Sequence, residues 1–147
     1  MAGLDLIANS GTQSLAADIA ETVLQLTTVA NHRIRIKGFS MTISGTASRD
    51  LIMRVLKQST AGTSGTAVTP VKIDPAAAET IQTGAATNFS AEPAAGDVLQ
   101  YKRLQSSYEK IFPLGQEIII ARGSRIAIEV TSVGNTASVA AEFLFEE

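Results

Sequence analysis

The chain has 147 residues, of which 45% are hydrophobic and 18% are charged, so it can bury the core of one folded domain without covalent cross-links. The absence of cysteine excludes disulfide frameworks, thiolate metal sites and cysteine nucleophiles. Its 12 basic and 14 acidic residues give a net charge of −2, which argues against nucleic acid as a partner. No apolar run approaches the roughly 18 residues of a membrane span, so we expect no membrane partner.

Residues 1–17 are small and polar, which predicts an extended N-terminal arm and not a core element. The arm has no early Lys or Arg and therefore does not resemble a secretory signal. We expect a single β-sandwich domain over residues 18–147 to follow the arm. The candidate contact residues of the arm are Leu4, Asp5, Leu6 and Ile7.

The first predicted strand contains Leu24 and Leu26 and ends at a turn near Ala30-Asn31, with a helix over residues 15–26 as the alternative. The segment RIRIKGFSMTIS, residues 33–44, then changes parity in mid-strand. Its large apolar residues share one parity before Gly38 and the other parity after it. A strand keeps one face buried across such a change only if a residue is inserted. We interpret Gly38 as the inserted residue of a β-bulge, with two short strands joined by a turn as the alternative.

Residues 51–58 are apolar on both faces and lie between loop-like segments, which predicts a strand, although Leu, Met, Arg and Lys also favour a helix. The following stretch, residues 58–97, is rich in Ala, Thr, Ser and Gly. Within it, Asp74 and Pro75 predict the N-cap and first position of a short helix. Residues 83–97 read as a long loop, of a length that is normally functional or packed on a partner.

Residues 98–116 fit either a strand or a helix, whereas residues 118–120 form a short apolar run typical of a buried strand. The final segment predicts a hairpin, with a turn at Gly134-Asn135. Its two strands alternate apolar and polar residues, from Ile126 to Val130 and from Val139 to Phe145. The sum is seven or eight strands with little helix, which predicts an all-β, jelly-roll-like antiparallel β-sandwich.

The sequence offers little catalytic chemistry. Its single histidine, His32, lies in a predicted turn, where we expect it to be solvated, and one histidine falls short of a jelly-roll metal site. Glu129 and Glu142 could lie close together as a carboxylate pair, but solvated outer faces are the simpler interpretation. Aromatic platforms for sugars are scarce, since there is no Trp. We expect no catalytic, metal-binding or cofactor-binding residue, no cofactor and no enzymatic activity.

One electrostatic feature remains. Arg33, Arg35 and Lys37 share a strand face and form a candidate contact stripe for an acidic partner surface or a phosphate. A solvated outer face is the alternative.

Several segments, in this order, resemble small tailed-bacteriophage virion proteins that decorate the capsid. They are RIKGFSMTISGTAS, VLKQSTAGTSGTAVTP, DPAAAET, and the closing IAIEVTSV and ASVAAEFLFEE. The resemblance covers residues 19–147, apart from YKRLQSSYEKIF, which has no counterpart in the pattern. It consists of strands and small residues, so no functional residue carries over.

The resemblance implies a jelly-roll decoration, or cement, protein that stabilises the head by multivalent contacts. It would be made in the bacterial host cytoplasm and would sit on the outer capsid surface of the virion. Its implied partners are the phage major capsid protein and further copies of itself, as a homotrimer. The alternative is a receptor- or glycan-binding jelly roll of a phage tail spike or fibre.

Overall fold

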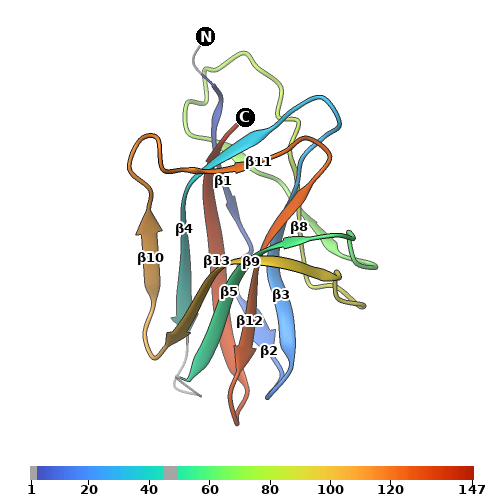
Figure 1. The fold of residues 1–147 in the computed structure, drawn as a ribbon, viewed down its shortest axis with the longest axis vertical. Helices are drawn as coiled ribbons and strands as arrows, with labels where there is room; N and C mark the ends of the chain where they lie inside the picture. The colour runs from blue at the N-terminus through green and yellow to red at the C-terminus, as the bar shows by residue number, and fades with distance from the viewer. Residues whose placement is uncertain (1–2, 45–49) are drawn as a thin grey trace.

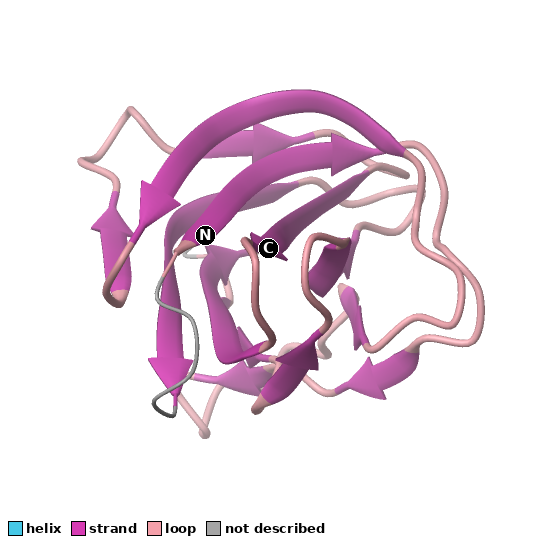
Figure 2. Ribbon diagram, turned by 90° about the horizontal axis from the view of Figure 1, so that it is seen from below, coloured by secondary structure: helices cyan, strands magenta, loops and turns pink. Residues whose placement is uncertain are grey.

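The structure is a computed structural model that describes residues 3–44 and 50–147. These residues form 13 strands and no helix. The strands are divided between two antiparallel sheets that face each other across the core, and viewed along the long axis they form two curved layers (Figures 1 and 2). The all-β sandwich predicted from the sequence is therefore confirmed.

The two sheets differ in size. Sheet A contains β1 (Asp5–Asn9), β2 (Gln13–Leu15), β4 (Ile34–Ser44), β7 (Val71–Lys72), β10 (Tyr108–Ile111), β11 (Ile118–Ile120) and β13 (Ala137–Glu146). Sheet B contains β3 (Ala20–Thr27), β5 (Leu51–Gln58), β6 (Thr66–Val68), β8 (Gly84–Thr87), β9 (Ala95–Leu104) and β12 (Arg125–Ser132).

The strand order is that of a jelly roll. β1 and β2 pair with successive parts of β13, and β10 and β11 pair with successive parts of β4, so each pair acts as one interrupted strand. Counted in this way, eight strands make up the sandwich. Sheet A then has the order β10/β11, β4, β13, β1/β2, and sheet B has the order β3, β12, β5, β9, which are the two four-stranded sheets of a jelly roll. β6, β7 and β8 are additions at the edges.

The predicted C-terminal hairpin is wrong, although both of its strands exist. β12 pairs with β3 and β5 in sheet B, which leaves it no free edge, and β13 pairs with β4, β1 and β2 in sheet A. The connection at Gly134 therefore carries the chain from one sheet to the other. Alternating apolar residues bury one face of each strand in either arrangement, so the pattern does not distinguish a hairpin from two strands that face each other.

The predicted bulge in residues 33–44 is confirmed, and β4 is one continuous strand. Leu144 is opposite Gly38 and Phe145 is opposite Ile36, so Lys37, and not Gly38, is the extra residue relative to β13. Gly38 has a different role. A Cβ at this position would lie 2.6 Å from the Cδ1 of Ile111 and 2.8 Å from the carbonyl oxygen of Lys110, so the glycine allows β10 to approach closely.

The predicted N-terminal arm is corrected by the structure. Residues 5–9 form β1, which pairs with β13 on one side and β7 on the other, and Leu4, Leu6 and Ala8 are buried in the core. The sandwich therefore includes residues before position 18. Apolar residues at three alternate positions give this segment a buried face, and β13 supplies a long strand for it to pair with.

The short helix predicted at Asp74 and Pro75 is also wrong. The chain makes only a turn there, in which the Asp74 carboxylate accepts a hydrogen bond from the Ala76 amide at 2.9 Å. The surrounding insertion supplies β6, β7 and β8 and covers one lateral edge of the sandwich. Side chains of the insertion form hydrogen bonds with backbone groups of β3. The Glu92 carboxylate accepts a hydrogen bond from the Thr22 amide, and the Thr87 hydroxyl donates one to the Val23 carbonyl.

Segments that were ambiguous in the sequence are strands in the structure. Residues 20–27 and 51–58 are β3 and β5, and the segment from residue 98 to 116 contributes most of β9 and all of β10. β9 lies in sheet B and β10 in sheet A, so the short turn between them crosses the sandwich. The core that the two sheets share is centred on large side chains, among them Leu6, Leu24, Phe39, Met41, Met53, Phe143 and Phe145.

Candidate functional site

The residues of the two predicted contact sets meet at one end of the molecule, where the N- and C-termini also lie (Figure 1). The Lys37 ammonium forms ion pairs with Asp5 at 2.6 Å and with Glu146 at 2.7 Å. Burial disfavours its charge, but the hydrogen bonds and attraction from both carboxylates outweigh that penalty and raise the pKa of Lys37. Lys37 thus holds β1, β13 and β4 together and is not available as part of a free basic stripe.

The candidate contact segment of the arm is divided by its strand alternation. Leu4 and Leu6 point into the core, and neither can meet a partner while β1 stays in the sheet. Asp5 is bound to Lys37, as described above. Of the four candidate contact residues, only Ile7 has an apolar side chain on the outer face of sheet A, where it is half-buried.

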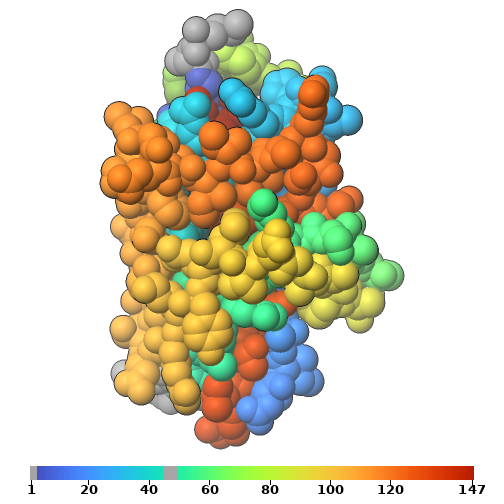
Figure 3. Space-filling model, in the orientation of Figure 1, coloured from blue at the N-terminus to red at the C-terminus, as the bar shows by residue number. Residues whose placement is uncertain are grey.

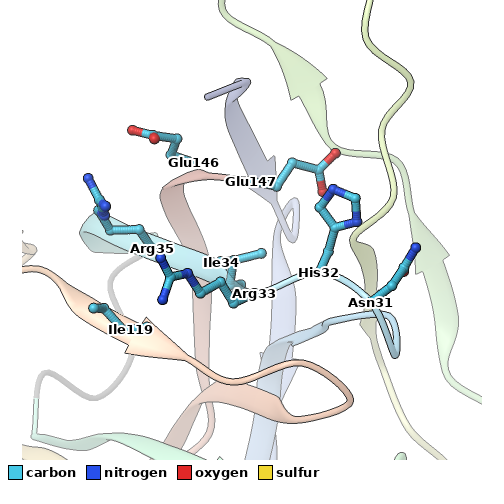
Figure 4. Close-up of a pocket in the computed structure, with 8 residues that line it drawn as sticks. All are labelled: Asn31, His32, Arg33, Ile34, Arg35, Ile119, Glu146 and Glu147. Atoms are coloured by element: carbon cyan, nitrogen blue, oxygen red, sulfur yellow. The ribbon is translucent and has the colours of Figure 1, made fainter. Parts of the chain in front are cut away.

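Arg33 and Arg35 line a pocket of about 300 Å³, together with His32, Ile119 and Glu147 (Figure 4). In the part of the chain that the structure describes, neither guanidinium forms a hydrogen bond or an ion pair. The Glu147 carboxylate accepts hydrogen bonds from the amides of Gln82 and Thr83, both at 2.8 Å. Positively and negatively charged side chains therefore line the same pocket, so the pocket is not a purely basic surface.

His32 is half-buried beside Glu147 and is not the solvated turn residue that we expected (Figure 4). Its Nδ1 atom is buried and has no hydrogen-bond partner. The carboxylate pair considered from the sequence is not formed, because Glu129 lies on β12 and Glu142 on β13, in different sheets. Within residues 3–44 and 50–147, no cluster of three or more His, Asp or Glu side chains could hold a metal ion.

Sequence reasoning missed a row of apolar residues across the outer face of sheet A. Direct register partners connect five strands: Val71 faces Ile7, Ile7 faces Leu144, Leu144 faces Gly38, and Gly38 faces Ile111. We call these five residues the apolar row. Its two ends are well exposed, with 65% of Val71 and 58% of Ile111 accessible to solvent.

Rows of polar residues border the apolar row on both sides. Toward the termini lies the row of Asp5, Glu146 and Arg35, which ends at the exposed Ile119 on β11, and on the other side lies the row of Asn9, Glu142, Ser40 and Glu109. An apolar band between polar borders is typical of a protein contact surface. A signal was present in the sequence, since Ile7 and Leu144 have the parity of the polar face of their strands.

A second exposed region lies on sheet B, where β9 runs over the face seen in Figure 3. Of its ten residues, Leu104 is buried and Gln100 is half-buried, while the other eight are exposed. Val98, Leu99 and Tyr101 are among the exposed ones, although large apolar side chains usually lie in the core.

Comparisons with protein-family models, with curated proteins and with solved structures found no match for this chain. In the described ranges, no helix is long and apolar enough to cross a membrane.

Proposed function

We propose that this protein is a structural virion component that binds the outer surface of a phage capsid and stabilises the head, with the apolar row as its contact surface. The observation that carries the proposal is the row itself: five neighbouring strands of a rigid sheet align apolar residues between two polar borders. The resemblance of residues 19–147 to capsid decoration proteins supplies the identity of the partner, the phage major capsid protein.

The energetics suit repeated weak contacts. Full burial of an isoleucine or valine side chain stabilises a complex by about 1.5–3 kcal/mol, and the row offers two such side chains that are mostly exposed and two that are half-buried. One copy would therefore bind weakly. A homotrimer would present three rows on one particle, and its effective local concentration raises the overall affinity without any new contact.

The test is co-sedimentation with empty heads of the parent phage from which this protein has been removed. The variant Val71→Glu/Ile111→Glu places two charges at the ends of the row, and we expect its affinity for heads to fall at least about tenfold. Ile19→Glu is the matched control, because Ile19 is also an exposed isoleucine, with 54% of its surface accessible, but lies between β2 and β3. Equal binding of both variants, or no binding of the wild type, would overturn the proposal.

Copy number separates this role from that of a tail spike or fibre protein. A decoration protein is expected in hundreds of copies per particle, whereas a tail receptor-binding protein is present in a few. Quantitative mass spectrometry of purified virions measures the ratio of this chain to the major capsid protein.

A further inference from the structure

The strand β9 is the most unusual element of the sandwich. It is as long as β13, yet nearly all of β9 is solvent-accessible, while alternate residues of β13 are fully buried. Tyr101, with 60% of its surface accessible, and Val98, with 46%, expose more apolar surface than the rest of sheet B. Single exposed apolar residues need no explanation, but three within four positions of one strand form a patch.

The cause of this exposure is that β9 ends sheet B. It pairs only with β5, and its second edge has no neighbour in the described part of the fold. Across the sandwich, the Lys102 ammonium lies 5.8 Å from the centre of the Tyr108 ring at the start of β10. An open strand edge that carries apolar side chains is a surface on which another chain readily packs.

Charge along β9 points to the identity of that chain. Asp97 lies near the beginning of the strand and forms no ion pair within the described residues, whereas Lys102 lies near its end; the neighbouring Arg103 is already paired with Asp50 at 2.7 Å. Two β9 strands placed side by side in opposite directions bring Asp97 of one copy beside Lys102 of the other. In the antiparallel register that faces Asp97 with Lys102, Val98 also faces Tyr101, so apolar and charged residues match together.

We propose that β9 is the self-association strand of this protein, with a second copy of the chain as its occupant. Asp97 of one copy lies beside Lys102 of the other, and Val98, Leu99 and Tyr101 are buried between them. This antiparallel contact is isologous, so it closes as a twofold pair. The inference goes beyond the proposed function, because it concerns the free protein and does not depend on any capsid.

The test is the molar mass in solution, measured by light scattering over a range of protein concentrations. We expect the wild type to exceed the monomer mass of 15.4 kDa and Leu99→Glu/Tyr101→Glu to return to it. Val71→Glu/Ile111→Glu is the matched control, since it adds the same charge on sheet A and should leave the mass unchanged. Circular dichroism and thermal unfolding confirm that each variant is folded.

Charge reversal separates a specific contact from general stickiness. Asp97→Lys alone should weaken association at least about tenfold, because it sets two lysines face to face, and Asp97→Lys/Lys102→Glu should recover part of it. A wild type that is monomeric at all concentrations would overturn the inference, as would an oligomer that the Leu99→Glu/Tyr101→Glu variant leaves intact. The apolar row is a different surface, so the two proposals fail distinguishably: a monomeric wild type would remove the multivalency that raises affinity for heads, whereas loss of head binding by Val71→Glu/Ile111→Glu would leave self-association intact.

Discussion

The two lateral edges of the sandwich differ in how they are finished. At one edge, β7 pairs with β1, β8 and β6 extend sheet B beyond β3, and side chains of the insertion satisfy the remaining backbone groups of β3. At the other edge, β9 and β10 end their sheets without a covering segment in the described residues. The chain thus pairs one edge with its own insertion and leaves the outer backbone edges of β9 and β10 without a neighbour in the described residues, and an open strand edge is where a further chain can pair.

The largest expected effect is a difference in unfolding free energy between a variant in β1, next to the closed edge, and a variant in β9, at the open edge. Leu6 on β1 is fully buried, so Leu6→Ala should lower the free energy of unfolding by about 2–5 kcal/mol, through lost burial and a residual cavity. Tyr101→Ala on β9 should change it by less than about 0.5 kcal/mol. Urea unfolding at a concentration where the protein is monomeric measures both. A small effect of Leu6→Ala would return β1 to the status of a detachable arm.

Two glutamines of sheet B, Gln58 and Gln100, allow the same comparison with an intermediate expected effect on stability. Gln58 is buried next to the insertion, accepts a hydrogen bond from Gln25 at 2.6 Å and donates one to Thr22 at 2.9 Å. Gln58→Ala should cost about 1–3 kcal/mol, because it leaves buried polar partners unsatisfied. Gln100 on β9 is the matched control, since its Oε1 atom has no hydrogen-bond partner. Chemical unfolding should therefore show a clearly smaller loss for Gln100→Ala.

The smallest expected effect concerns two lysines, and it depends on pH. Lys37→Met should cost about 1 kcal/mol at neutral pH, because it removes two ion pairs and leaves Asp5 facing Glu146. The folded-state pKa of Lys37 lies above its usual 10.5, so this stabilisation is complete below pH 10.5 and is lost as the pH rises through the raised value. The difference between wild type and variant should shrink accordingly in thermal unfolding between pH 8 and strongly alkaline pH.

Lys102→Met is the control for that series. In the described residues the Lys102 ammonium forms no ion pair and lies near the ring of Tyr108, so its replacement should change stability by less than about 1 kcal/mol. A loss equal to that of Lys37→Met would contradict the distinction between a structural lysine and an exposed one.

Local patterns predicted the strands well and their partners poorly. The parity change around Gly38 was enough to predict the bulge, because the two-residue period of a strand is a local property. The same kind of pattern gave a hairpin for β12 and β13, which belong to different sheets. Asp74 and Pro75 are good helix-start residues, yet a turn forms, since the chain continues into extended segments that complete the sheet edges.

The candidate contact residues show the same division. The predicted stripe is only partly formed: Arg35 and Lys37 lie on β4, Arg33 precedes the strand, and the bulge and the neighbours on β1 and β13 separate their roles. The apolar row was not predicted, because its members come from five strands and only Ile7 and Leu144 carry a local signal, an apolar residue with the parity of a polar face.

The sequence by itself determined that this protein is an all-β sandwich with one bent strand, because side-chain alternation, glycine and turn residues act over a few neighbouring positions. The tertiary structure alone decided which strands pair, that residues 5–9 belong to the core, and which apolar side chains remain exposed. These outcomes depend on register between segments far apart in the chain, such as Ile7 with Leu144, and a local pattern contains no information about that register.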